Sequence, residues 1–206
     1  MRLGKDRVEV QGNPLQAAEK IYLVVNKPRG LVTTAHDEKG RETVYSLLPG
    51  NIPWIAPVGR LDRGSEGLLL FTNDSEWAAR ITDPCSPVDK TYHVQIGVLA
   101  DAELLESLER GVETPAGGTL KAKHASVLRA GEKSSWLEIV LDEGKNRQIR
   151  RMLEGLGVDV LRLVRVAIGP LELSDLAKGA YRELRPDEKA ALDRWMGLNL
   201  RTQSVH

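Results

Sequence analysis

Short stretches of alternating or β-branched residues, separated by turn-forming glycine and proline, dominate this chain. Such stretches favour β-strands. We predict strands at residues 7–10, 20–26, 54–60, 68–73, 90–98, 120–128, 135–141 and 160–168. The sequence shows no regular alternation of strand and helix, which would indicate a parallel sheet with crossover helices. It therefore predicts an α+β fold with a mixed, mostly antiparallel sheet and flanking helices.

Four stretches have helical features instead. Asp101 precedes a leucine stripe that ends at Gly111, and Asp74 opens a shorter helix. Pro186, followed by two acidic residues, begins the last helix. The fourth helix begins near residue 146, since apolar residues recur there at helical spacing until Gly157 ends the pattern.

Length and composition limit the class of protein. A chain of 206 residues can form one large domain or two small subdomains that share a cleft. No apolar stretch is long enough to cross a bilayer, and residues 1–6 lack the apolar core of a secretory signal. The single cysteine, Cys85, excludes an internal disulfide framework, and no Cys/His cluster has the spacing of a zinc site. We expect a cytoplasmic protein without metal or membrane association.

Positive charge is concentrated in one region. The formal net charge is zero, which argues against indiscriminate coating of nucleic acid. Residues 145–165 nevertheless contain only two acids, Glu154 and Asp159, against six cations: Lys145, Arg147, Arg150, Arg151, Arg162 and Arg165. A segregated positive surface of this kind can contact phosphates.

The stretch GRLDRGSEGLLLFTND, at residues 59–74, is the first candidate for chemistry. It places Asp62 between Arg60 and Arg63, just before an apolar strand. A lone aspartate in a turn is usually a cap or an ion-pair partner. Here the next strand is apolar on both faces and anchors the loop to the core. The two arginines also favour the ionised carboxylate that a nucleophile or a base requires.

The second candidate is Tyr92 in DKTYHVQIGV. Alternation places it on the same strand face as Val94 and Ile96. The ordinary interpretation is a core tyrosine whose hydroxyl finds a partner. The functional interpretation is a flat ring on which a nucleobase stacks.

The third candidate is DEGKNRQIRRMLEGLG, at residues 142–157. Its cationic helix face is either a solvated surface or an anion-binding site. Arg150 follows Arg147 by three positions, so both side chains can point into the same space. An arginine at this place can hold the Asp62 carboxylate through a two-pronged hydrogen-bonded pair.

Together these stretches resemble a known family. In order and spacing they resemble the ribosomal RNA pseudouridine synthases of type A, which act on the small subunit, and of types B, E and F, which act on the large subunit. The stretches that carry this resemblance are NKPRGLVTT, VGRLDRGSEGLLLFTND, KTYHVQIGV, EGKNRQIRRMLEGLG and LVRVAIGPLEL. The resemblance covers about residues 20–185. It implies the pseudouridine synthase fold with a central catalytic cleft between two subdomains, within residues 19–200. The implied reaction isomerises a specific uridine of ribosomal RNA, with 23S rRNA as the expected target, without metal or cofactor.

The resemblance also implies residue roles. Asp62 matches the catalytic aspartate, and Tyr92 matches the tyrosine that stacks on the flipped uracil and is a proposed proton carrier. Arg150 matches the basic residue that pairs with the aspartate, with Arg147 as the alternative. We therefore expect Asp62 and Arg150 within hydrogen-bonding distance and Tyr92 in the same cleft. The expected RNA-binding rim consists of Lys27, Arg29, Arg60, Arg63, Lys145, Asn146, Arg147, Gln148 and Arg151.

The N-terminal region departs from the family. Many relatives begin with a complete S4-like RNA-binding domain, whereas DRVEVQGNPL resembles only its last strand. We expect residues 1–18 to be the remnant or tail of such a segment, either shortened as in the type E synthases or truncated. The alternatives are a non-catalytic rRNA-binding assembly factor, or a synthase acting on 16S rRNA or tRNA. We expect a monomer whose RNA target is a stem-loop or bulge.

Overall fold

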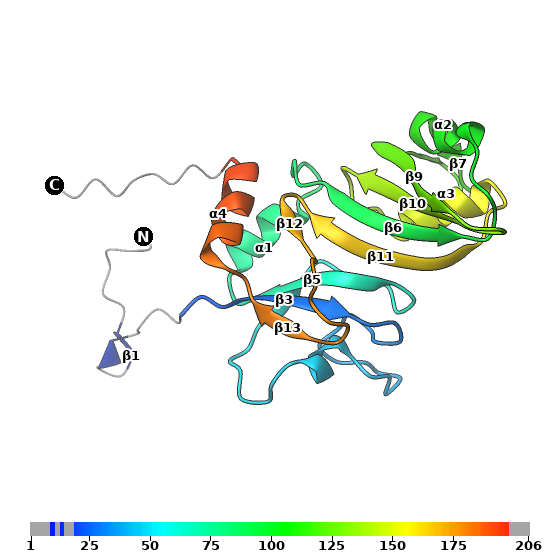
Figure 1. Cartoon of the computed structure of the whole chain (residues 1–206). Helices are drawn as coiled ribbons and strands as arrows, with labels where there is room; N and C mark the ends of the chain where they lie inside the picture. Colours follow the sequence, from blue (N-terminus) through cyan, green and yellow to red (C-terminus); the bar gives the residue numbers. More distant parts are fainter. Residues whose placement is uncertain (1–8, 11–12, 15–18, 198–206) are drawn as a thin grey trace.

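The computed structural model describes residues 9–10, 13–14 and 19–197. Its centre is a nine-stranded sheet with the order β13-β3-β5-β11-β6-β10-β9, with β12 paired to β11 and β4 to β5 (Figure 1). The strands are β3 (Tyr22–Lys27), β4 (Ala56–Val58), β5 (Glu66–Thr72), β6 (Lys90–Ile96), β9 (His124–Ala130), β10 (Ser135–Leu141), β11 (Val160–Ile168), β12 (Leu171–Glu172) and β13 (Tyr181–Glu183). Among the strands described, only β5 and β11 pair in parallel. The predicted mixed, mostly antiparallel sheet is confirmed.

Two small hairpins lie outside this sheet. One pairs β1 (Glu9–Val10) with β2 (Asn13–Pro14), and the other pairs β7 (Val112–Glu113) with β8 (Thr119–Leu120). Most of the expected S4-like remnant at 1–18 lies outside the described residues.

All four predicted helices are confirmed. They are α1 (Ser75–Thr82), α2 (Ala102–Arg110), α3 (Gln148–Gly155) and α4 (Pro186–Trp195), and a 3-10 helix, η1 (Val44–Leu47), adds a single turn. The side chains of Asp74 and Asp101 accept hydrogen bonds from backbone amides in the first turns of α1 and α2, as N-caps do. None of the four is long and apolar enough to cross a membrane, within the part of the chain that the structure describes.

The strand predictions differ from the structure in two main ways. The predicted strand at 120–128 is split, with β8 ending at Leu120 and β9 beginning at His124. The Ala122 amide between them donates to the Leu108 carbonyl of α2, so this part of the chain leaves the sheet. The sequence also did not predict β13, which pairs with β3.

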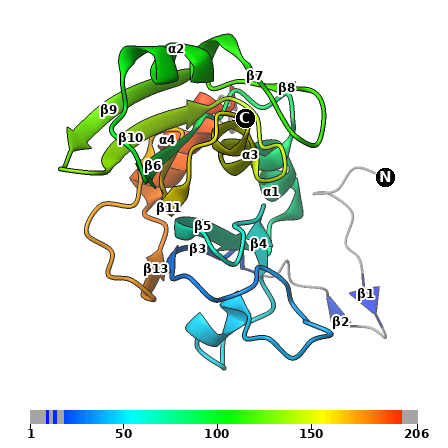
Figure 2. The ribbon, with the colours of Figure 1, turned by 90° about the vertical axis from the view of Figure 1, so that its right-hand side faces the viewer.

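The hydrophobic core is divided between two halves of the molecule. In both views the half with α2, α3, β6, β9 and β10 lies above the half with β3, β5 and β13 (Figures 1 and 2). In the upper half, Ile139 of β10 packs in one cluster with Met152 and Leu153 of α3. In the lower half, Leu69 and Phe71 of β5 pack against residues of β3 and η1. A third cluster lies around α1 and α4.

Strands β5 and β11 bring the two halves together. Arg165 of β11 pairs with Gly67 of β5, and a side chain at Gly67 would place its Cβ 2.2 Å from the Arg165 carbonyl oxygen. Gly67 also has a φ of +103°, which residues with a side chain rarely adopt. Glycine is therefore required where the two halves meet.

Candidate active site

Asp62 lies in the loop between β4 and β5, and buried groups hold the backbone of this loop. The Lys27 ammonium donates to the carbonyl oxygens of Asp62 at 3.1 Å, Ser65 at 2.9 Å and Pro28 at 3.0 Å. The Thr33 hydroxyl donates to the Leu61 carbonyl at 2.7 Å. Because these contacts use backbone carbonyls, the Asp62 carboxylate stays available, and 29% of its side chain is exposed.

Lys27 is fully buried, so it does not lie on the RNA-binding rim where we expected it. Burial lowers the pKa of Lys27 from its ordinary value of 10.5 to about 8, although the charges of Asp62 and Glu66 oppose this change. Lys27 is therefore a structural support for the Asp62 loop.

This pKa predicts how stability depends on pH. Between pH 8 and 10.5 the native state has released the Lys27 proton while the unfolded state keeps it, so the cost of burying the charge disappears as the pH rises. Relative to Lys27→Met, the wild type should gain roughly 3 kcal/mol of unfolding free energy across this range. Urea unfolding of both proteins between pH 7 and 10.5 measures the difference. A difference that does not change with pH would contradict the assigned pKa.

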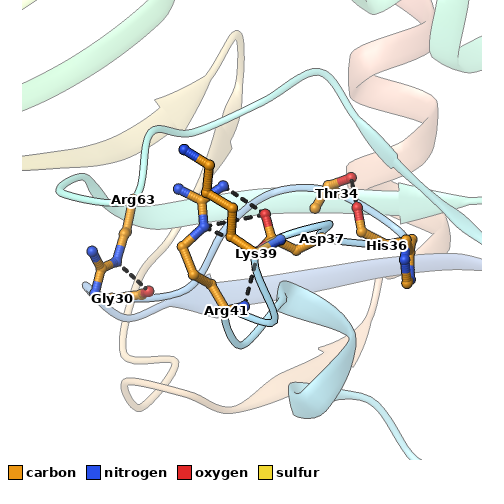
Figure 3. A network of polar contacts seen from close by, with 7 residues as sticks. All are labelled: Gly30, Thr34, His36, Asp37, Lys39, Arg41 and Arg63. Carbon is orange, nitrogen blue, oxygen red and sulfur yellow. Dashed lines mark hydrogen bonds and ion pairs between the residues drawn. The ribbon is translucent and has the colours of Figure 1, made fainter.

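The chain between β3 and η1 forms a second loop beside the Asp62 loop. Figure 3 shows the guanidinium of Arg63 donating to the Gly30 carbonyl, at 3.0 Å, and the Gly30 amide donates back to the Arg63 carbonyl at 2.8 Å. Further along, Arg41 donates to the Asp37 carboxylate from its side chain and its backbone, and these bonds hold the pKa of Asp37 well below its usual range. The two loops therefore support each other.

The arginine that pairs with Asp62 is Arg147. Its Nη1 lies 3.5 Å from Asp62 Oδ2. The structure records no ion pair between Asp62 and Arg150, although both residues are described, so the expected hydrogen bond between them was wrong. Arg150 instead donates from Nη2 to the Gly64 carbonyl at 2.9 Å. Burial and the charges of Arg147 and Arg29 lower the pKa of Arg150, and the nearby charge of Asp62 opposes this change.

Arg147 has an unusual backbone conformation. It is the N-cap residue of α3, with a φ of +50° and a ψ of 32°, the left-handed region that favours glycine. A residue with a side chain is strained there by about 1 kcal/mol. Strained positions of this kind are often found at functional sites.

The strain leads to a paired prediction. Arg147→Gly and Arg147→Ala both remove the ion pair with Asp62, which is worth about 0–1 kcal/mol on an exposed side chain. Only glycine removes the backbone strain, so Arg147→Gly should be about 1 kcal/mol more stable than Arg147→Ala in thermal unfolding. Equal stability of the two variants would show that the backbone is unstrained.

Tyr92 lies in the row of residues that crosses the sheet beside the Asp62 loop. It pairs with Arg165 of β11, Arg165 pairs with Gly67 of β5, and Gly67 pairs with Lys27 of β3. Tyr92 is half-buried and packs against the core clusters of both halves, including the one that contains Leu61. Its ring therefore lies where the two halves meet.

The predicted rim is only partly exposed. Arg29, Arg60, Arg63, Lys145, Asn146 and Arg147 are exposed. Gln148 is buried, and its side-chain amide donates to the Lys121 carbonyl and the Glu143 carboxylate. Arg151 is half-buried and donates to Thr114 Oγ1 of the β7–β8 hairpin at 3.0 Å. Like Lys27, these two residues make structural contacts, which spacing on the helix did not reveal.

Sequence reasoning missed two residues near the site. Arg165 is buried, donates from Nε to the Leu68 carbonyl at 2.8 Å, and lies beside Tyr92 in register. Glu66, also buried, forms ion pairs with Arg162 and Lys178. A charged residue inside an apolar strand was the available signal for both. Within the described residues, no three His, Cys, Asp or Glu side chains gather as a metal site would require.

Comparison with known proteins gives a consistent result. Residues 21–155 match the RNA pseudouridylate synthase family. Ribosomal large subunit pseudouridine synthase B of Bacillus subtilis (strain 168) is 41% identical over 188 residues, covering 90% of this chain and 76% of that protein. Ribosomal large subunit pseudouridine synthase E of Vibrio vulnificus (strain CMCP6) is 37% identical over 183 residues, covering 82% of this chain and 77% of that protein. The crystal structure of a pseudouridylate synthase superposes with a TM-score of 0.73 at 29% identity, covering 84% of this chain and 74% of that one.

Proposed function

Because this chain belongs to the RNA pseudouridylate synthase family, we propose that it converts one uridine of 23S ribosomal RNA to pseudouridine, with Asp62 as the reacting carboxylate. The names of the two relatives support the choice of RNA. One observation carries the choice of residue: the Asp62 carboxylate is partly exposed beside Arg147, on a loop whose backbone is fixed by the buried Lys27 and Thr33.

The reaction requires few chemical groups. The bond between N1 of uracil and C1′ breaks, the base turns, and a new bond forms between C5 and C1′. The proton on C5 leaves and N1 gains a proton, so the atoms balance without oxidation or group transfer. Asp62 either attacks C1′ or removes the C2′ proton, while Tyr92 offers a ring on which the detached uracil stacks.

The need for the target uridine to reach Asp62 also limits which RNA structures can be substrates. The target uridine must leave its stack to reach the Asp62 carboxylate on the loop between β4 and β5, and this costs least where the RNA is already unpaired. We therefore propose a loop or bulge as the target. The exposed cations Arg29, Arg60 and Arg63 would contact the phosphates around it.

Release of tritium tests this function. The purified protein is incubated with 23S and 16S rRNA transcripts labelled with tritium at C5 of uridine, and Asp62→Asn is the control. We expect release from the 23S transcript alone, at about one equivalent, since the C5 hydrogen must leave. Release from 16S rRNA alone, or from a tRNA transcript labelled in the same way, would contradict the proposed target. Binding of RNA without release would favour an assembly factor.

A further inference from the structure

Within the residues that the structure describes, no helix covers one face of the upper half of the sheet. In β10 every second residue is buried, and the buried side packs against α2 and α3. The residues between them, Trp136, Glu138 and Val140, are only half-buried. This face therefore points away from α2 and from α3, the helix that begins at Arg147.

The open face contains a groove of about 360 Å³, here called the sheet groove. Its lining residues are His93, Leu128, Arg129, Trp136, Arg162, Val164 and Val166. The guanidinium groups of Arg129 and Arg162 lie 5.2 Å and 5.7 Å from the centre of the Trp136 ring system. Leu128 beside them is 46% exposed. The sheet groove thus combines an aromatic ring, exposed apolar surface and two guanidinium groups.

Positive charge exceeds negative charge around the sheet groove. Arg162 and Lys178 share a single carboxylate, that of Glu66. Glu138 lies 3.5 Å from His93. Arg129 has no ion-pair partner among the described residues. Three cations thus face two carboxylates, and this excess of positive charge favours an anionic ligand.

A line of cations connects the sheet groove to Asp62. Arg147 pairs with Asp62, and Arg29 is close enough for its charge to lower the pKa of Arg150. The Arg29 guanidinium also lies 3.4 Å from the carbonyl oxygen of Leu161, the residue before Arg162. An extended chain of phosphates at Asp62 can follow these cations past the beginning of β11 to the sheet groove.

We infer that the sheet groove binds a single-stranded segment of the substrate RNA that flanks the target uridine. Bases stack on Trp136 and Leu128, and phosphates pair with Arg129 and Arg162. An open antiparallel sheet face with an aromatic ring and arginines is a general platform for unpaired bases. The excess of cations favours RNA over a protein partner, and the identity of this RNA as the substrate rests on the proposed function.

Charge reversal in the sheet groove tests the inference. The affinity of Arg129→Glu is compared with that of the wild type on a 23S rRNA fragment and on the same fragment trimmed to its stem-loop. The matched control is Arg110→Glu on α2, an exposed cation on the opposite side of the sheet. We expect Arg129→Glu to weaken binding of the long fragment about tenfold and to lower its salt slope by about 1. The affinity of Arg129→Glu for the trimmed fragment should stay near that of the wild type. The affinity of Arg110→Glu should stay near that of the wild type on both fragments.

Trp136 provides an independent readout. Trp136→Ala should weaken binding of the long fragment about fivefold or more, while Trp136→Phe keeps a ring for stacking and should retain most of the affinity. Equal losses on long and trimmed fragments, or equal losses in Arg129→Glu and Arg110→Glu, would overturn the inference. So would a wild type that is dimeric in solution and becomes monomeric in Trp136→Ala with unchanged RNA affinity, since the sheet groove would then bind a second copy of the chain. Because these are binding measurements, a wild type that shows this pattern but forms no pseudouridine overturns only the proposed function.

Discussion

Asp62→Asn is expected to lower the rate of pseudouridine formation by at least about a thousandfold while the protein stays folded. The amide cannot attack C1′ or accept the C2′ proton, so the reacting group is lost. The Asp62 side chain is 29% exposed and its ion pair with Arg147 is solvent-accessible, so the loss of stability should be within about 1 kcal/mol. Single-turnover tritium release and thermal unfolding measure the two effects separately.

The result distinguishes catalysis from structure. The contacts that hold this loop use the backbone carbonyls of Leu61 and Asp62, which asparagine at position 62 leaves in place. A variant that keeps more than a tenth of the wild-type rate would show that the carboxylate is not the reacting group. A variant that unfolds would instead contradict the expectation that the Asp62 side chain contributes little to stability. Arg147→Lys is a useful companion variant, since it keeps a positive charge beside Asp62 and should lose less activity than Arg147→Ala.

Gly67→Ala should have the largest effect on stability. The added methyl group would lie 2.2 Å from the Arg165 carbonyl oxygen and 2.8 Å from its amide nitrogen, and these backbone atoms belong to a paired strand and cannot move aside. The positive φ of Gly67 adds strain. We expect a loss of more than about 3 kcal/mol in urea unfolding, or failure to fold.

Gly50→Ala is the matched control for this substitution. Gly50 is not among the glycines with a positive φ, and a Cβ there meets no atom within 4 Å. Its stability should therefore change by less than about 0.5 kcal/mol. If Gly67→Ala were as stable as Gly50→Ala, the close contact between β5 and β11 would be wrong, and with it the placement of Tyr92 beside the Asp62 loop.

The sequence predicted those elements whose own residues carry a strong pattern. The predicted limits at 135–141 and 160–168 match β10 and β11, since alternation or β-branched residues continue over their whole length. By contrast, β13 has three residues, and its place depends on pairing with β3, more than 150 positions earlier. A strand held only by so distant a partner leaves no local pattern.

The site residues also divide into those that a local pattern predicts and those whose position depends on distant partners. Chemical type and spacing singled out Asp62, Tyr92 and the two arginines, but not which arginine contacts the aspartate. Which arginine contacts Asp62 depends on the left-handed backbone of Arg147 and on the Gly64 carbonyl, which accepts a hydrogen bond from the Arg150 guanidinium. The burial of Lys27 was also hidden, because two of its acceptors lie 35 and 38 residues further along the chain.

Mapping pseudouridine in ribosomal RNA tests the proposed activity most directly. Total rRNA is compared from cells that contain the wild-type protein, lack it, or contain Asp62→Asn, with chemical labelling and mass spectrometry to detect each modified base. We expect one uridine of 23S rRNA, in a loop or bulge, to be modified only with the wild type. Identical maps with and without the protein, or full modification with Asp62→Asn, would contradict the account.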